Sequence, residues 1–215
     1  MEGFEFTIRA SELKLAMTDP SNKANALSET TLNWLREKAC FDFFGIKKQI
    51  DTREMRKGIE CEEDSIELYN SVNFTYGGKN QITFKKDFFT GTPDLLIEDK
   101  VIDIKTSWSF DTFPMFFSDA EKMVKKGGYD WQVQQYMMLT GKRRAEVAFC
   151  FVTTPSHLLT QYDDLKLHNA DLIEESKRVT VVELNYSDEK EEEMYKRASI
   201  LEKEYFKLIE ELKRK

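Results

Sequence analysis

The sequence contains few of the residues that cysteine- and histidine-based sites require. Its three cysteines, Cys40, Cys61 and Cys150, are odd in number and far apart. This spacing argues against a disulfide framework, a zinc knuckle and a four-cysteine iron–sulfur cluster. His157 and His168 are the only histidines, and they lack the helical spacing or cysteine neighbours of a zinc site. Any metal chemistry in this chain is therefore expected to depend on oxygen ligands.

Long apolar runs are absent as well. No stretch of roughly twenty apolar residues occurs, and the first residues do not have the basic-then-apolar order of a secretory signal. We therefore predict no membrane span and a cytoplasmic location, in a bacterium or a phage-infected host. The four prolines are scattered, and we find no internal repeat and no Pro/Gly/Ser linker. The simplest interpretation is a single domain over residues 1–215.

The net charge of −7 is unusual for a protein that binds nucleic acid, because phosphate contacts need lysine and arginine. The charges are unevenly distributed, however. Basic residues outnumber acidic ones across residues 47–57, and two more basic clusters lie at residues 122–126 and 142–144, whereas residues 188–193 are almost purely acidic. A site that collects carboxylates for a metal also lowers the net charge without repelling a phosphate, because the bound cation reverses the local field.

Hydrophobic periodicity predicts an α/β fold. Helices are expected after Ser11, from Ser28 to Gly45, over residues 54–70, 118–124 and 129–139, and over a long C-terminal segment, residues 188–213. Short β-rich runs at residues 72–76, 81–84, 95–97 and 101–104 suggest an antiparallel meander, and strands are expected at 145–152 and 179–184. We predict a mixed central sheet flanked by helices, with a core over about residues 54–185 and an N-terminal helical segment over residues 1–53. In the C-terminal helix, we interpret an apolar stripe as a packing surface: Met194, Ala198, Leu201, Tyr205, Leu208 and Leu212.

Two aspartates and a lysine are the strongest candidates for chemistry. Asp94 follows Pro93 in a turn, and Asp103 and Lys105 lie in the next β-rich run. Side chains alternate along a strand, so Asp103 and Lys105 should point to one face, and a hairpin would bring Asp94 beside them. Hard cations such as Mg²⁺ take oxygen ligands, so two aspartates, a backbone carbonyl and a substrate phosphate make a plausible coordination shell. A lone Asp-X-Lys is more often a surface ion pair, and only the whole set favours catalysis.

The set resembles the signature of the PD-(D/E)XK nuclease superfamily, and in particular its branch of phage lambda-type exonucleases and RecB-like nucleases. Residues 55–69 look like the helix in which a glutamate follows a glycine by four residues, as Glu62 follows Gly58. Gln132 and Tyr136 are similar to the Gln-x-x-x-Tyr helix that comes after the lysine. The resemblance covers about residues 55–152 and implies a restriction-endonuclease-like core.

This resemblance implies a role for each matching residue. Asp94, Asp103 and the backbone carbonyl of Ile104 would bind Mg²⁺, or Mn²⁺ as a substitute, with one or two ions, and Glu62 would reach the metal directly or through water. Lys105 would position the attacking water, and Gln132 would hold Lys105 or a phosphate. Weaker substrate-binding candidates are Thr92, Tyr136 and Ser11.

The implied function is a DNA exonuclease of phage-recombination type that acts on linear duplex ends, with a single-strand annealing protein as partner and with homo-oligomers an open question. Lambda-type enzymes hold a 5′ phosphate with two basic residues, and Phe4 and Asp111 stand at about those positions here. Arg9 could substitute for the first, whereas nothing obvious substitutes for the second. End polarity therefore stays open. Two alternatives also remain: a structure- or site-specific endonuclease, and a catalytically silent protein that binds DNA or a recombination partner.

Overall fold

A four-stranded mixed sheet forms the centre of the protein. The computed structural model describes residues 3–46 and 51–214, so Lys47 and Lys48 of the first basic cluster lie outside it. The strands run in the order β4 (Leu95–Ile97), β5 (Lys100–Thr106), β6 (Arg144–Cys150) and β7 (Val179–Asn185). β5 and β6 are parallel, whereas β4 and β7 pair antiparallel to their neighbours. The predicted mixed central sheet is confirmed.

A smaller sheet stands apart from the central one. It has the order β1 (Ile8–Arg9), β3 (Phe89–Gly91) and β2 (Phe84–Lys86), with β1 parallel and β2 antiparallel to β3. The predicted antiparallel meander is therefore wrong, because the run at residues 81–84 leads into β2 of this sheet, whereas the runs at residues 95–97 and 101–104 form β4 and β5 of the other. β1 and β3 were not predicted from the sequence. The pattern of short β-rich runs carries no information on which runs pair.

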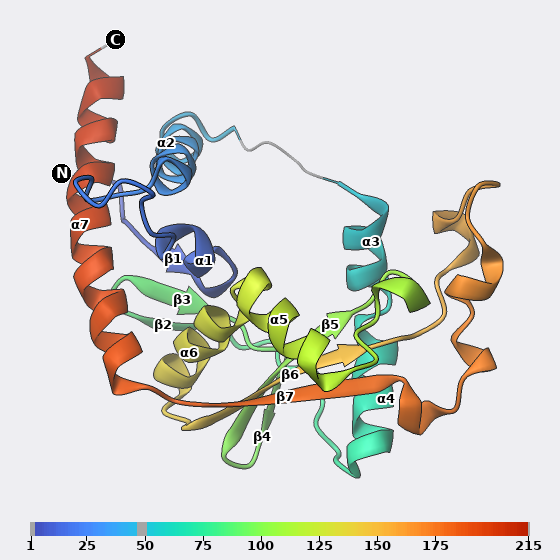
Figure 1. The fold of residues 1–215 in the computed structure, drawn as a ribbon. Coiled ribbons are helices and arrows are strands. Elements are labelled where there is room, and N and C mark those ends of the chain that lie inside the picture. Colours follow the sequence, from blue (N-terminus) through green and yellow to red (C-terminus); the bar gives the residue numbers. More distant parts are fainter. Residues whose placement is uncertain (1–2, 47–50, 215) are drawn as a thin grey trace.

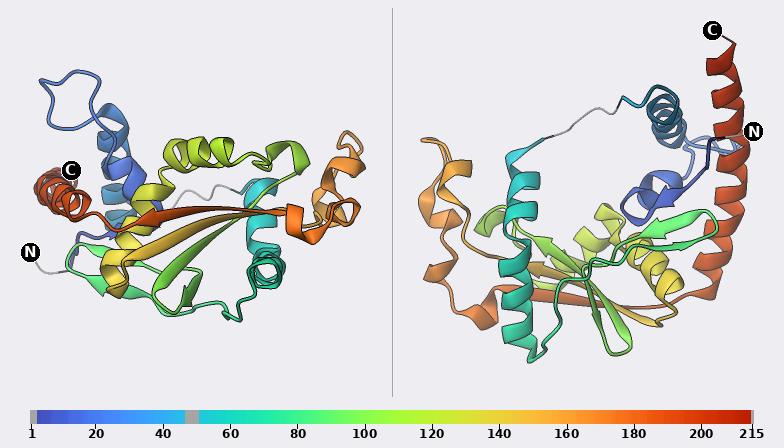
Figure 2. Two further views of the ribbon diagram at one scale, coloured as in Figure 1. Left: turned by 60° about the horizontal axis from the view of Figure 1, so that its bottom comes forward. Right: turned by 180° about the vertical axis from the view of Figure 1, so that it is seen from behind.

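Helices cover both faces of the central sheet (Figure 1). The helices are α1 (Leu13–Ala16), α2 (Glu29–Phe44), α3 (Arg53–Glu60), α4 (Glu62–Asn73), α5 (Phe117–Gly127), α6 (Tyr129–Thr140) and α7 (Asp188–Lys213). Figure 2 shows α5 and α4 on opposite sides of the sheet. Residues of α5 and α6 share one apolar core with Val101, whereas residues of α4 share another with Ile102 and Ile104. Alternation along β5 thus serves both cores.

Capping residues explain where α2 begins and ends. The Ser28 side chain accepts a hydrogen bond from the Thr31 amide, and Gly45 ends the helix at a φ of 68°. That conformation suits a glycine and closes the last turn. The predicted helix from Ser28 to Gly45 is confirmed.

Other predicted elements differ from the structure in their bounds or in kind. The helix expected over residues 54–70 is two helices that meet at Cys61. The strand expected at residues 72–76 does not form, because α4 continues to Asn73 and ends at Phe74 with a φ of 55°. The short helix expected after Ser11 forms as α1, but Ser11 does not cap it, because Ser11 lies inside a 3-10 helix (Ala10–Glu12) and the N-cap of α1 is Glu12. β-propensity is a weak preference, and tertiary packing can override it. Val72 packs on the apolar core that α4 shares with Ile102 and Ile104, so it stays in the helix. The strand expected over residues 81–84 begins only at Phe84.

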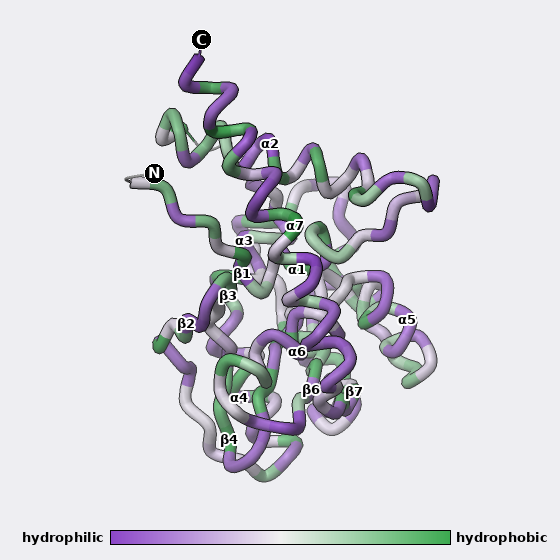
Figure 3. Tube along the Cα trace, turned by 90° about the vertical axis from the view of Figure 1, so that its left-hand side faces the viewer, coloured by the Kyte–Doolittle hydropathy of each residue, from purple (hydrophilic) through white to green (hydrophobic). Residues whose placement is uncertain are grey.

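The long C-terminal helix is confirmed with the bounds expected from the sequence. Apolar and polar stretches alternate along it (Figure 3), and its apolar residues pack on α2 and the N-terminal segment. Met194, Ala198, Leu201 and Tyr205 are buried, whereas Leu208 and Leu212 are only partly so, and Ile209 is buried in their place. Within the described residues no helix, including α7, is long and apolar enough to cross a membrane.

If the stripe on α7 is a packing surface, its residues should matter for stability and their neighbours should not. Leu201 is fully buried, so Leu201→Ala should lower the free energy of unfolding by about 2–5 kcal/mol, because it removes apolar contacts and leaves a cavity. Ile200 is 44% exposed, and Ile200→Ala should change the free energy of unfolding by about 0.5 kcal/mol or less. Urea denaturation of both variants measures the difference, and equal effects would contradict this packing.

Candidate active site

The register of the central sheet brings Asp94 and Asp103 together. Leu95 pairs with Ile102 in the antiparallel β4–β5 ladder. One step further along this register, Asp94 lies opposite Asp103. Asp94 is the residue just before β4, where the edge of β5 is open. There the Ile104 amide donates a hydrogen bond of 2.7 Å to Asp94 Oδ2. The Asp94 carboxylate thus accepts the hydrogen bond that a backbone carbonyl of a paired strand would otherwise accept.

Asp103 and Lys105 project from β5 toward α6, as alternation along the strand predicts. Lys105 Nζ lies 2.9 Å from Asp103 Oδ2, and Gln132 Nε2 donates to Asp103 Oδ1 at 3.0 Å. Gln132 Oε1 accepts from Lys105 Nζ at 3.4 Å, while its Nε2 also donates to the Tyr136 hydroxyl at 3.0 Å. One buried amide therefore orients both the carboxylate and the ammonium.

The two aspartates impose an electrostatic cost on each other. Burial raises the pKa of Asp94 to about 7, and the negative charge of Asp103 adds to this effect. Burial also raises the pKa of Asp103, although Lys105 opposes the shift. Close carboxylates in a low-dielectric site disfavour double ionisation unless a cation joins them. A cation bound between the two aspartates would therefore stabilise their ionised forms.

Lys105 remains a cation in this environment. Burial lowers its pKa, but the charges of Asp103 and Asp94 and the hydrogen bond to Asp103 outweigh that effect, so the pKa is raised overall. The Tyr129 ring also faces the ammonium, with Nζ 4.5 Å from the ring centroid. An aromatic face attracts a cation through its quadrupole. Lys105 is thus a fixed positive charge beside the two acids.

Glu62 lies at the start of α4 and has a partner that sequence analysis did not suggest. Its Oε2 pairs with Lys79 Nζ at 2.9 Å. In the part of the chain that the structure describes, no three acidic, histidine or cysteine side chains lie close enough together to form a metal site by themselves. Glu62 therefore does not join Asp94 and Asp103 in one tight cluster.

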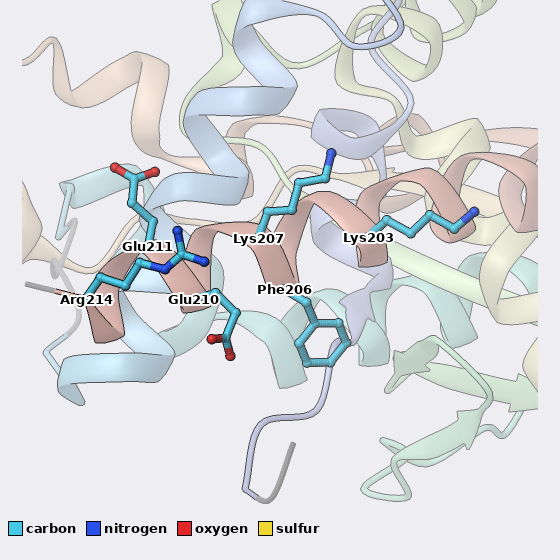
Figure 4. A pocket seen from close by; sticks show the side chains of 6 residues that line it. All are labelled: Lys203, Phe206, Lys207, Glu210, Glu211 and Arg214. Atoms are coloured by element: carbon cyan, nitrogen blue, oxygen red, sulfur yellow. The ribbon is translucent and has the colours of Figure 1, made fainter.

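A cleft of about 620 Å³ unites these residues. Its lining includes all of the predicted acids and the lysine, together with Gln132, Tyr129, Trp108 and Met55. Another hollow lies on α7, where Lys203, Phe206 and Lys207 point to different sides of one helix (Figure 4). Because those side chains do not converge, the hollow on α7 lacks the arrangement of a catalytic site.

The weaker substrate-binding candidates lie outside the lining of this cleft. The Thr92 hydroxyl shares a hydrogen bond of 2.8 Å with the Thr83 hydroxyl. Tyr136 is buried and packs against Gly91, where a Cβ would meet its ring at 2.7 Å. Ser11 is exposed, next to Ala10 in the same 3-10 helix. The structure brings Glu62, Asp94, Asp103, Lys105 and Gln132 into one cleft, and these three residues are not part of its lining.

The residues at the β5 edge fit a hard divalent cation. Asp103 is 1% exposed, and within the described residues its Oδ2 has no hydrogen-bond partner beyond the ion pair with Lys105. Mg²⁺ is usually bound by one or two carboxylates and keeps its other positions for waters and substrate phosphates. Two aspartates with the neighbouring Ile104 carbonyl satisfy this requirement without a third acid in the cluster.

Tyr129 and Lys79 were missed by sequence reasoning for different reasons. Tyr129 comes one helical turn before Gln132 on α6, so helical spacing from Gln132 could have indicated it. Lys79 lies in an irregular segment between α4 and β2, where no periodicity indicates a direction for the side chain. Only the tertiary structure brings Lys79 to Glu62.

The fold of this chain is shared with known exonucleases. A phage-related exonuclease from Haemophilus somnus 129PT is 30% identical, with 97% of each chain covered and a TM-score of 0.92. An alkaline exonuclease from Laribacter hongkongensis has the same fold at 19% identity, with 97% of this chain and 92% of that chain covered and TM-scores of 0.67 alone and 0.66 in complex with dAMP. No protein-family model and no curated sequence matches. The chain belongs to the family of the phage-related exonuclease.

The raised pKa of Asp94 predicts a pH-dependent gain in stability when its charge is removed. Folding takes up a proton at Asp94 between its ordinary pKa of 3.8 and about 7, so its contribution to stability falls as the pH rises through that window. In EDTA, Asp94→Asn should raise the unfolding temperature more at pH 8 than at pH 5. Asparagine keeps the acceptor for the Ile104 amide.

The matched control is Glu37→Gln, which neutralises an exposed carboxylate on α2. It should leave the unfolding temperature nearly unchanged at both pH values, as surface substitutions usually do. An Asp94→Asn effect that is equal at the two pH values, or larger at pH 5, would contradict the assigned electrostatics.

Proposed function

We propose that this chain is a divalent-metal-dependent exonuclease that hydrolyses phosphodiester bonds at the ends of duplex DNA. The observation that carries the proposal is the opposition of Asp94 and Asp103 beside Lys105 in one cleft. Membership of the family of a phage-related exonuclease supports it further. Both observations together favour nuclease chemistry over a protein that binds DNA without cutting it.

Asp94, Asp103 and the Ile104 carbonyl would hold Mg²⁺, or Mn²⁺ in its place, and Glu62 would contribute directly or through water. The ion, when bound, activates water and withdraws charge from the phosphate. The carboxylates gain from the same ion, because it relieves the repulsion between two partly or fully buried acids. One or two ions are compatible with this arrangement.

Lys105 acts in this proposal as a charged donor. Its ammonium is held between Asp103, Gln132 and the Tyr129 ring, so it can orient the attacking water and offset negative charge that develops on the phosphate. Gln132 hydrogen-bonds to both Lys105 and Asp103 and so fixes their relative positions. Fixed polar groups of this kind stabilise a transition state because they need no reorganisation during the reaction.

Ends are favoured over specific sites because the chain belongs to the family of a phage-related exonuclease. A role in phage recombination, with a single-strand annealing protein as partner, is supported by the kinship with a phage-related exonuclease.

The test uses end-labelled linear duplex and covalently closed circular DNA, each with Mg²⁺ or with EDTA. Wild type should shorten only the linear DNA and only with Mg²⁺, and Lys105→Ala should lose at least about a hundredfold in rate, because it removes an electrostatic contact to the transition state. Which label is released first gives the polarity.

Lys196→Ala is the matched control, because Lys196 is an exposed lysine of α7 that pairs with Glu192 and lies outside the cleft lining and the basic clusters. It should keep the wild-type rate. Cleavage of the circle would indicate an endonuclease, and DNA binding without cleavage in any of several metals would overturn the proposed function.

A further inference from the structure

Lys79 brings a second cation to the rim of the cleft. Its Nζ lies 2.9 Å from Glu62 Oε2, and the two side chains are 37% and 24% exposed. The hydrogen bond to Glu62 raises the pKa of Lys79, and the charges of Glu62, Glu63 and Asp94 act in the same direction. Three carboxylates therefore act on one ammonium that solvent can still reach.

Hydrogen bonds on both sides fix the segment that carries Lys79. The next residue, Asn80, donates its amide to the Asp94 carbonyl at 2.7 Å and its side chain to the Pro93 carbonyl at 2.9 Å. Before it, the Asn70 side chain of α4 donates to the Gly77 carbonyl at 2.8 Å. The backbone near Lys79 is thus tied to the turn that presents Asp94 and to the helix that presents Glu62.

A divalent ion at Glu62 and the ammonium of Lys79 repel each other. Two like charges a few ångströms apart interact unfavourably even in a partly hydrated site, so a metal ion that uses Glu62 favours release of Lys79. The long lysine stem lets the ammonium move while its backbone stays fixed. A released ammonium beside a metal-bound phosphodiester would meet a phosphate oxygen, for which lysine is a suitable point charge.

We infer that Lys79 pairs with Glu62 in the free protein, and that its ammonium moves to a DNA backbone phosphate when Glu62 binds a divalent ion. The inference rests on the proposed function, because it assumes that metal and DNA meet in this cleft. It assigns Lys79 a phosphate-binding role and makes it a competitor of the metal. An ordinary surface ion pair would have neither property.

The first arm of the test measures Mn²⁺ binding by isothermal titration calorimetry without DNA. Lys79→Met removes the competing charge and should tighten Mn²⁺ binding about two- to fivefold, the range expected of a partly exposed ion pair. The matched control is Lys85→Met, since Lys85 is a surface lysine that pairs with Glu5 at 2.7 Å and does not line the cleft. It should leave the Mn²⁺ affinity unchanged.

The second arm measures DNA binding at several salt concentrations, with Ca²⁺ in place of Mg²⁺ because its looser coordination disfavours the chemical step. Lys79→Met should weaken binding and lower the slope of log affinity against log salt by about 0.9, the loss of one phosphate contact. Lys79→Arg keeps the charge and should keep most of the slope.

Opposite signs in the two arms are the expected signature: tighter Mn²⁺ and weaker DNA binding in Lys79→Met. Weaker binding of both would mean that Lys79 only supports the structure, and no change in either would make it a plain surface pair; each result overturns the inference. If wild type itself binds neither Mn²⁺ nor DNA, the proposed function fails, which is a different result from a silent Lys79 variant.

Discussion

The site depends on the placement of two carboxylates at one open strand edge. β4 begins at Leu95, so Asp94 lies just before the strand, where the β4–β5 ladder has stopped, and its carboxylate accepts a hydrogen bond from the Ile104 amide. The same register brings Asp103 opposite Asp94. This repulsive arrangement persists because strand pairing to β6, the apolar cores on both faces and the Gln132 amide hold it in place. Strain of this kind is typical of a site that gains when a cation binds.

Much of this arrangement was accessible from the sequence, because it follows from local rules. Alternation along a strand places Asp103 and Lys105 on one face and Ile102 and Ile104 on the other. The contacts of the first two with Gln132 and the packing of the two isoleucines in the α4 core confirm this. A short turn between two β-rich runs was enough to bring Asp94 to Asp103. The long C-terminal helix was equally clear, because its stripe repeats over many turns.

Features that depend on tertiary contacts could not be predicted in the same way. β1 has two residues and exists only because it pairs with β3, which lies far away in the sequence. Which β-rich runs share a sheet was misjudged for the same reason. Lys79 reaches Glu62 from an irregular segment whose course is set by hydrogen bonds to Asn70 and to the Asp94 turn. No pattern of types or spacing encodes such a contact.

Anomalous X-ray diffraction from crystals grown with Mn²⁺ tests the central claim most directly. The account predicts a manganese peak within bonding distance of the carboxylates of both Asp94 and Asp103, and loss of that peak in Asp103→Asn. A peak elsewhere with none between these aspartates, or no bound manganese at concentrations that saturate other metal-dependent nucleases, would contradict it.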